Sequence, residues 1–127
     1  MPGELTGKKI LLVDDDKDIL MTMEAALQEE GPEVLTARDG NAAITLAEER
    51  KPDLVVLDMM LPKRSGFLVM ERLKRGRDKS EMPRVIMVTA NPGTRHKQYA
   101  QRLGVDEYLN KPFRMEKLVE AIKRLLR

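Results

Sequence analysis

Carboxylates follow two short apolar runs in this chain, and their position suggests chemistry rather than folding. Ile10–Val13 leads directly into three consecutive aspartates, Asp14–Asp16, and Leu54–Leu57 leads into Asp58. A short apolar run is typical of a buried strand. Carboxylates crowded at the ends of strands repel one another and raise each other's pKa unless a cation neutralises them. The pattern therefore indicates a site that holds positive charge.

Two further residues complete the candidate site, because each lies at the end of an apolar run or just after it. Thr89 ends one run and Lys111 follows another. Carboxylate oxygens without histidine or cysteine favour a hard cation, and Mg²⁺ suits a site that supplies few protein ligands and keeps its waters. Asp14, Asp15 and Asp58 carry a charge of −3, which one Mg²⁺ and Lys111 balance together.

Each of these residues alone also has a plain structural explanation. We interpret Asp16 as a helix N-cap, since aspartate is a preferred residue there. Asp58 alone fits a loop carboxylate, and Thr89 alone fits a β-branched strand residue. Lys111 alone fits a solvated charge, because lysine is rarely buried. Only their arrival at one sheet edge favours a shared site.

Strands and helices alternate along the chain and predict how the site is positioned. Strands are expected at 9–13, 33–37, 54–57, 84–89 and 105–109. Helices are expected at about 18–30, from just after residue 40 to about 50, and at 65–75, 94–103 and 115–126. This alternation predicts an α/β fold, a doubly wound parallel sheet with helices on both faces. Ligands bind such sheets outside the carboxyl ends of the strands. We expect one domain over residues 1–127, with its core at about 8–126.

Composition excludes several classes of protein. The net charge is +2, and the basic cluster Lys74, Arg75, Arg77 and Lys79 has no interleaved aromatic residue, so direct nucleic-acid binding is not expected. There is no cysteine, which excludes disulfides, thiolate metal sites and thiol catalysis. No apolar run reaches membrane-spanning length and no signal peptide is recognisable, so we expect a cytoplasmic protein without membrane contact.

Four segments together resemble the receiver domain of two-component response regulators. They are LLVDDD (11–16), DLVVLDMMLPKRSG (53–66), VIMVTA (85–90) and EYLNKPF (107–113). The resemblance covers nearly the whole chain, with matching order and spacing. It implies a flavodoxin-like, five-stranded parallel sheet of order 2-1-3-4-5, with two helices on one face and three on the other.

The resemblance also implies roles for the residues that accept phosphate and hold metal. Asp58 corresponds to the phosphoacceptor and Lys111 to the phosphate-binding lysine. Asp15 is similar to the direct Mg²⁺ ligand, and Asp14 to the one that acts chiefly through bound water. The backbone carbonyl of Met60 matches a further protein ligand beside Asp58.

A second group of implied roles concerns switching. Thr89 corresponds to the switch hydroxyl and Tyr108 to the aromatic switch residue. The backbone N–H of Ala90 joins Lys111 in contacting phosphate, and the Lys111–Pro112 peptide is expected to be cis. The implied output surface is the fourth helix, the fifth strand and the fifth helix.

The implied partners follow from this chemistry. A sensor histidine kinase or a phosphotransfer protein supplies the phosphoryl group, and the output passes to a downstream protein or to an output domain outside this chain. The sequence leaves open whether phosphorylation promotes a dimer. Met60 and Asn91 are expected to flank the path of the water that removes the phosphoryl group. Because an apolar Met60 does not orient water, we expect slow self-dephosphorylation.

Three alternatives stay open at the level of sequence. A phosphatase of the haloacid dehalogenase type would use Asp14 of the Asp14–Asp16 block as its nucleophile. Against it, the chain is short, lacks a cap insertion and would leave Asp58 without a role. A flavodoxin-like cofactor module is disfavoured because an aspartate-rich loop repels the flavin phosphate. A receiver that works unphosphorylated is the third alternative.

Overall fold

The computed structural model describes residues 3–61, 63, 65–75, 83–90 and 94–127. Along the chain the elements are β1 (Lys9–Val13), α1 (Lys17–Gln28), β2 (Glu33–Ala37), α2 (Gly40–Arg50), β3 (Leu54–Asp58), α3 (Gly66–Lys74), β4 (Arg84–Thr89), α4 (Thr94–Arg102), β5 (Glu107–Asn110) and α5 (Met115–Leu126). Arg77, Lys79 and Asn91 lie outside the described residues.

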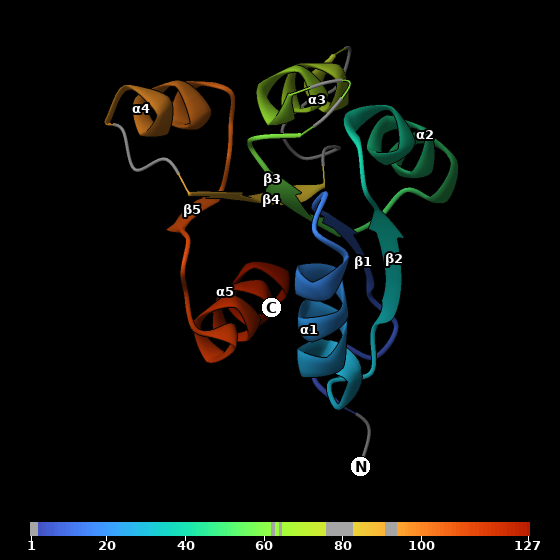
Figure 1. Cartoon of the computed structure of the whole chain (residues 1–127). Helices are drawn as coiled ribbons and strands as arrows, with labels where there is room; N and C mark the ends of the chain where they lie inside the picture. The colour runs from blue at the N-terminus through green and yellow to red at the C-terminus, as the bar shows by residue number, and fades with distance from the viewer. Residues whose placement is uncertain (1–2, 62, 64, 76–82, 91–93) are drawn as a thin grey trace.

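The strands form one parallel sheet in the order β2-β1-β3-β4-β5, which confirms the predicted α/β fold and strand order. Figure 1 shows α1 and α5 on one face of this sheet and α2, α3 and α4 on the other. The central strand β3 is buried at all five positions, as expected for a parallel strand covered on both faces. Parallel pairing brings the carboxyl ends of all strands to one edge.

The core has two layers because successive strand residues point to opposite faces. In β1, Leu11 and Val13 face α2 and α3, whereas Ile10 and Leu12 face α1 and α5. The stripe predicted for the last helix supplies the second layer, with Leu118 and Ile122 fully buried.

Side chains fix the starts of the helices that follow the site strands. The Asp16 carboxylate accepts hydrogen bonds from Asp18 N–H at 2.9 Å and Ile19 N–H at 3.3 Å, so it caps α1 as predicted. Ser65 caps α3 by accepting from Leu68 N–H. The helix predicted to run to about residue 30 ends at Gln28, because Gly31 has a φ of 82° and the chain turns there.

The fifth strand begins later than predicted. The sequence suggested 105–109, but β5 spans Glu107–Asn110. Val105 N–H bonds to the carbonyl of Ala100 in α4, and the Asp106 carboxylate accepts the N–H of Val85 at 2.8 Å. Asp106 N–H also donates to the Val85 carbonyl, so residue 106 contacts Val85 through both its backbone and its side chain, and regular pairing with β4 starts at Glu107. In the described part of the chain, no helix is long and apolar enough to cross a membrane.

Candidate functional site

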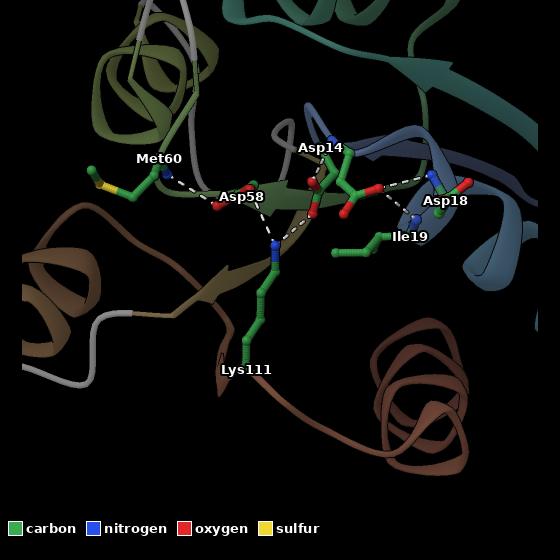
Figure 2. Close-up of polar contacts among 7 residues, drawn as sticks. Asp14, Asp18, Ile19, Asp58, Met60 and Lys111 are labelled. Atoms are coloured by element: carbon green, nitrogen blue, oxygen red, sulfur yellow. Dashed lines mark hydrogen bonds and ion pairs between the residues drawn. The ribbon is translucent and has the colours of Figure 1, made fainter.

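The predicted site residues converge at one edge of the sheet. Asp14 follows β1, Asp58 ends β3, Thr89 ends β4 and Lys111 follows β5. Figure 2 shows the Asp14, Asp58 and Lys111 side chains pointing toward one another. Asp14 is 2% exposed and Asp58 is 5% exposed, which is rare for carboxylates without a partner. Their burial therefore requires compensating charge.

Lys111 supplies part of that charge by bridging the two buried carboxylates. Its Nζ lies 2.8 Å from Asp14 Oδ2 and 3.3 Å from Asp58 Oδ2. The lysine is itself positioned by the sheet edge, because its backbone N–H donates to the Thr89 carbonyl at 2.7 Å. The bridge joins the ends of β1, β3 and β5.

Backbone N–H groups hold the other oxygen of each carboxylate. Asp16 N–H donates to Asp14 Oδ1 at 2.9 Å, and Met60 N–H donates to Asp58 Oδ1 at 3.0 Å. Both contacts are made two residues along the chain, where the backbone turns away from the strand. In each buried carboxylate, one oxygen thus accepts a backbone N–H and the other pairs with Lys111, which fixes the orientation of the carboxylate.

The protonation of the site follows from burial and from these charges. Burial raises the pKa of Asp58, and the Asp14 carboxylate adds to the rise, although Met60 N–H and Lys111 oppose it. Burial by itself lowers the pKa of Lys111, but its contacts with Asp14 and Asp58 outweigh burial and raise it. Lys111 is therefore a cation at neutral pH. Its single positive charge does not balance the two buried carboxylates, so the pocket keeps excess negative charge.

Asp15 completes a set of oxygen donors at the mouth of this pocket. One oxygen each from Asp14, Asp15 and Asp58 lie within 4.8 Å of one another, and Asp15 is exposed to solvent. Only carboxylates make up the set, so its chemistry fits a hard cation such as Mg²⁺ that keeps several waters. Met60 contacts Asp58 through its backbone N–H. The role of the Met60 carbonyl as a metal ligand stays a prediction.

Gly66 lets α3 begin close to the end of β3, which carries Asp58, and the sequence pattern did not single this glycine out. Its N–H donates to the Met59 carbonyl at 2.8 Å. A Cβ on Gly66 would lie 2.5 Å from the Asp58 carbonyl oxygen and 2.7 Å from Met59 Cα, so any side chain would push α3 away from β3. The signal in the sequence for this close approach was the glycine directly after Ser65, the N-cap of α3.

The remaining predicted residues lie close to this edge. Thr89 is fully buried, and Tyr108 on β5 pairs in register with Met87 of β4. The Tyr108 ring is half-buried against the core layer that contains α3, and burial raises its pKa. Ala90 is exposed, and the Lys111–Pro112 peptide is cis as expected. Asp16 belongs to the α1 cap and not to the cluster of candidate metal ligands.

Comparison with known proteins agrees with this arrangement. A family model described as the response regulator receiver domain matches residues 10–123. The chain belongs to the response-regulator receiver family. This assignment excludes the haloacid dehalogenase and flavodoxin alternatives, and it identifies the pocket of Asp14, Asp15 and Asp58 as the acidic pocket of a receiver domain.

Solved receiver domains share the whole fold. A CheY-like response regulator receiver domain from Methanospirillum hungatei is 31% identical, with a TM-score of 0.86 over 94% of this chain and 93% of that chain. The chemotaxis response regulator CheY4 of Vibrio cholerae is 30% identical, with a TM-score of 0.84 over 94% and 99%. The BeF3-activated DrrB receiver domain is 36% identical, with a TM-score of 0.82 over 94% and 97%.

Proposed function

We propose that this receiver domain accepts a phosphoryl group on Asp58 in a Mg²⁺-dependent reaction with a sensor histidine kinase or a phosphotransfer protein. The observation that supports this most strongly is the setting of Asp58. Its carboxylate is oriented by Met60 N–H and Lys111 and lies within 4.8 Å of oxygens from Asp14 and Asp15. A nucleophile is therefore held beside donors for a divalent cation.

The reaction is a single displacement at phosphorus. A carboxylate oxygen of Asp58 forms a bond to phosphorus while the bond from phosphorus to the donor's histidine nitrogen breaks, and the departing imidazole takes up a proton. Catalysis in such transfers comes from positioning and charge stabilisation. Asp14, Asp15, Asp58 and the Met60 carbonyl would hold the Mg²⁺ ion, which would supply positive charge for the phosphoryl oxygens. Water later hydrolyses the acyl phosphate, and the domain catalyses only these changes to itself.

Lys111 and Thr89 respond to the new phosphoryl group. Phosphorylation changes the charge at Asp58 from −1 to about −2 and adds acceptor oxygens. Lys111 already lies 3.3 Å from Asp58 Oδ2, so its ammonium is placed to contact those oxygens. In this proposal the Thr89 hydroxyl and the Ala90 N–H turn toward them as well. Thr89 ends β4 and Ala90 follows it, next to the end of β3.

The signal leaves through α4, β5 and α5. When Thr89 moves toward the phosphoryl group, Tyr108 turns further into the core, which shifts an equilibrium between two existing conformations. The half-buried position of Tyr108 supports this proposal. Arg124 of α5 pairs with Glu107 of β5, so a change at β5 reaches α5 directly.

The setting of the domain is part of the same proposal. Residues 1–127 form one receiver domain that acts in the cytoplasm, without contact to membranes or nucleic acid. Its output is a downstream protein or an output domain outside this chain, and phosphorylation can promote a dimer. The histidine kinase or phosphotransfer protein is its upstream partner.

Phosphorylation with acetyl phosphate tests the assignment of Asp58. We expect Mg²⁺-dependent incorporation in the wild-type protein, none in Asp58→Asn, and none in the presence of a chelator. Asp16→Asn is the matched control, since it makes the same chemical change at the α1 cap and asparagine also caps helices well. Incorporation into Asp58→Asn at the wild-type level would contradict the proposal, as would its loss in Asp16→Asn alone.

A further inference from the structure

The corner between β2 and α2 contacts the loop that carries two of the candidate metal ligands. At the end of β2, the Ala37 carbonyl accepts the N–H of Asp14 at 3.1 Å. The next residue, Arg38, donates from its Nη2 to the Asp15 carbonyl at 3.3 Å. Two successive residues of this corner thus hold two successive aspartates.

The same corner also reaches the loop that follows Asp58. Asp39 Oδ1 accepts the N–H of Ala42 at 2.8 Å and caps α2. Its other oxygen, Oδ2, lies 3.6 Å from the Nζ of Lys63 in the connection between β3 and α3. The hydrogen bond from Ala42 lowers the pKa of Asp39, and the charge of Lys63 contributes, so the carboxylate is ionised at neutral pH.

We propose that Arg38 and Asp39 act as a clamp that positions the ligands for Mg²⁺. Arg38 holds the Asp15 end of the site and Asp39 holds the loop after Asp58 through Lys63, so the two loops keep a fixed separation. This proposal rests on the proposed function, because it assumes that the acidic pocket binds Mg²⁺. Neither residue contacts the metal; both are positioning residues.

The clamp matters most for Asp15. Asp14 and Asp58 are fixed through both of their oxygens, whereas the polar contact of Asp15 in the described part of the chain runs through its backbone carbonyl. The direction of its exposed carboxylate therefore depends on how well that backbone is held. Mg²⁺ demands near-ideal octahedral geometry, and groups that orient metal ligands contribute strongly to metal affinity.

Charge and positioning predict opposite effects when Arg38 is removed. A cation close to the pocket repels Mg²⁺, so if Arg38 were only a nearby charge, its loss would tighten Mg²⁺ binding. If Arg38 holds Asp15 in place, its loss weakens binding despite the gain in electrostatic attraction. The sign of the change separates the two explanations.

Calorimetric titration of the unphosphorylated protein with Mg²⁺ tests the clamp without measuring phosphorylation. Arg38→Met keeps the aliphatic stem and removes the donors, and we expect it to weaken Mg²⁺ binding by about tenfold. Arg38→Lys keeps a charged donor and should bind Mg²⁺ within about twofold of the wild type. Arg50→Met is the matched control, because Arg50 pairs with Glu33 at the opposite edge of the sheet. This variant should bind Mg²⁺ with the affinity of the wild-type protein.

Two further measurements separate positioning from general stability. Thermal unfolding without Mg²⁺ should show Arg38→Met and Arg50→Met close to the wild type. Amide hydrogen exchange in the metal-free protein should accelerate at Asp16 in Arg38→Met and not in Arg50→Met. Lys63→Met removes the cation that pairs with Asp39 and should weaken Mg²⁺ binding by about twofold, whereas the loss of a nearby cation alone would tighten it.

The outcomes distinguish failure of the clamp from failure of the proposed function. Unchanged or tighter Mg²⁺ binding in Arg38→Met overturns the clamp, as does an equal loss of affinity in Arg50→Met. A wild-type protein that binds no Mg²⁺ contradicts the proposed function itself.

Discussion

Replacing Asp58 by asparagine should stabilise the metal-free protein. The substitution removes a buried charge but keeps the shape of the side chain and an oxygen that can accept the N–H of Met60. Burial is the largest cause of the raised pKa of Asp58, which means that the folded protein disfavours its ionised form. At neutral pH the wild-type protein therefore folds with an unfavourable charge that the variant lacks.

The size of the effect follows from the distances in the pocket. At an effective dielectric constant of about 20, Lys111 at 3.3 Å attracts the Asp58 carboxylate by about 5 kcal/mol. Asp14, with an oxygen within 4.8 Å, repels it by at least about 3.5 kcal/mol, and exposed Asp15 adds less because solvent screens its charge. These contributions nearly cancel. Desolvation of a carboxylate that is 5% exposed then decides the sign, and we expect a gain of about 1–3 kcal/mol in Asp58→Asn.

Thermal and urea unfolding in the presence of a chelator measure this gain. It corresponds to a rise of about 3–10 °C in the unfolding temperature for a domain of this size. Because the pKa of Asp58 is raised in the folded state, the wild-type protein recovers stability as the pH falls through that raised pKa toward the ordinary value of 3.8. The difference between the two proteins should therefore narrow at acidic pH.

Two controls make the measurement decisive. Asp16→Asn removes one charge from the exposed helix cap and should leave the stability within about 0.5 kcal/mol of the wild type. Added Mg²⁺ should stabilise the wild-type protein more than Asp58→Asn, because the variant lacks one of the three carboxylates proposed to hold the ion. Equal or lower stability of Asp58→Asn without metal at neutral pH would refute the reasoning, as would a gap that stays constant on acidification.

Three other substitutions test separate parts of the account. Lys111→Met leaves two buried carboxylates without their cation and should lower the free energy of unfolding by about 2–4 kcal/mol at neutral pH; unchanged urea unfolding would count against the bridge. Met60→Asn places a group that orients water beside Asp58 and should shorten the phosphoryl lifetime, whereas an unchanged or longer lifetime contradicts the idea. Glu71→Gln should lower the pKa of Tyr99, which the hydrogen bond to Glu71 raises, and leave Tyr108 unchanged; ultraviolet titration in which Tyr99 keeps its raised pKa argues against that contact.

The order of strands and helices could be predicted because it depends on local patterns. Apolar runs such as Leu54–Leu57 mark strands that are covered on both faces, and parallel pairing then brings Asp14, Asp58 and Lys111 together. The cap at Asp16 is equally local, because it depends on N–H groups two and three residues away. These features require no knowledge of distant packing.

The features that sequence reasoning missed depend on contacts between distant segments. The need for glycine at Gly66 arises only when α3 approaches the end of β3 closely. The contact of Arg38 with Asp15 joins residues 23 positions apart, and nothing in the local sequence of Arg38 indicates it. The late start of β5 results from the side chain of Asp106 bonding to Val85 across the sheet.

Identification of the phosphorylated residue tests the central claim most directly. After reaction with acetyl phosphate and Mg²⁺, borohydride reduction converts an acyl phosphate to an alcohol, and peptide mass spectrometry locates it. We predict modification of Asp58 alone, with the Asp14–Asp16 block unmodified. Modification within that block, or the absence of any modified aspartate under conditions in which the protein binds Mg²⁺, would contradict the account.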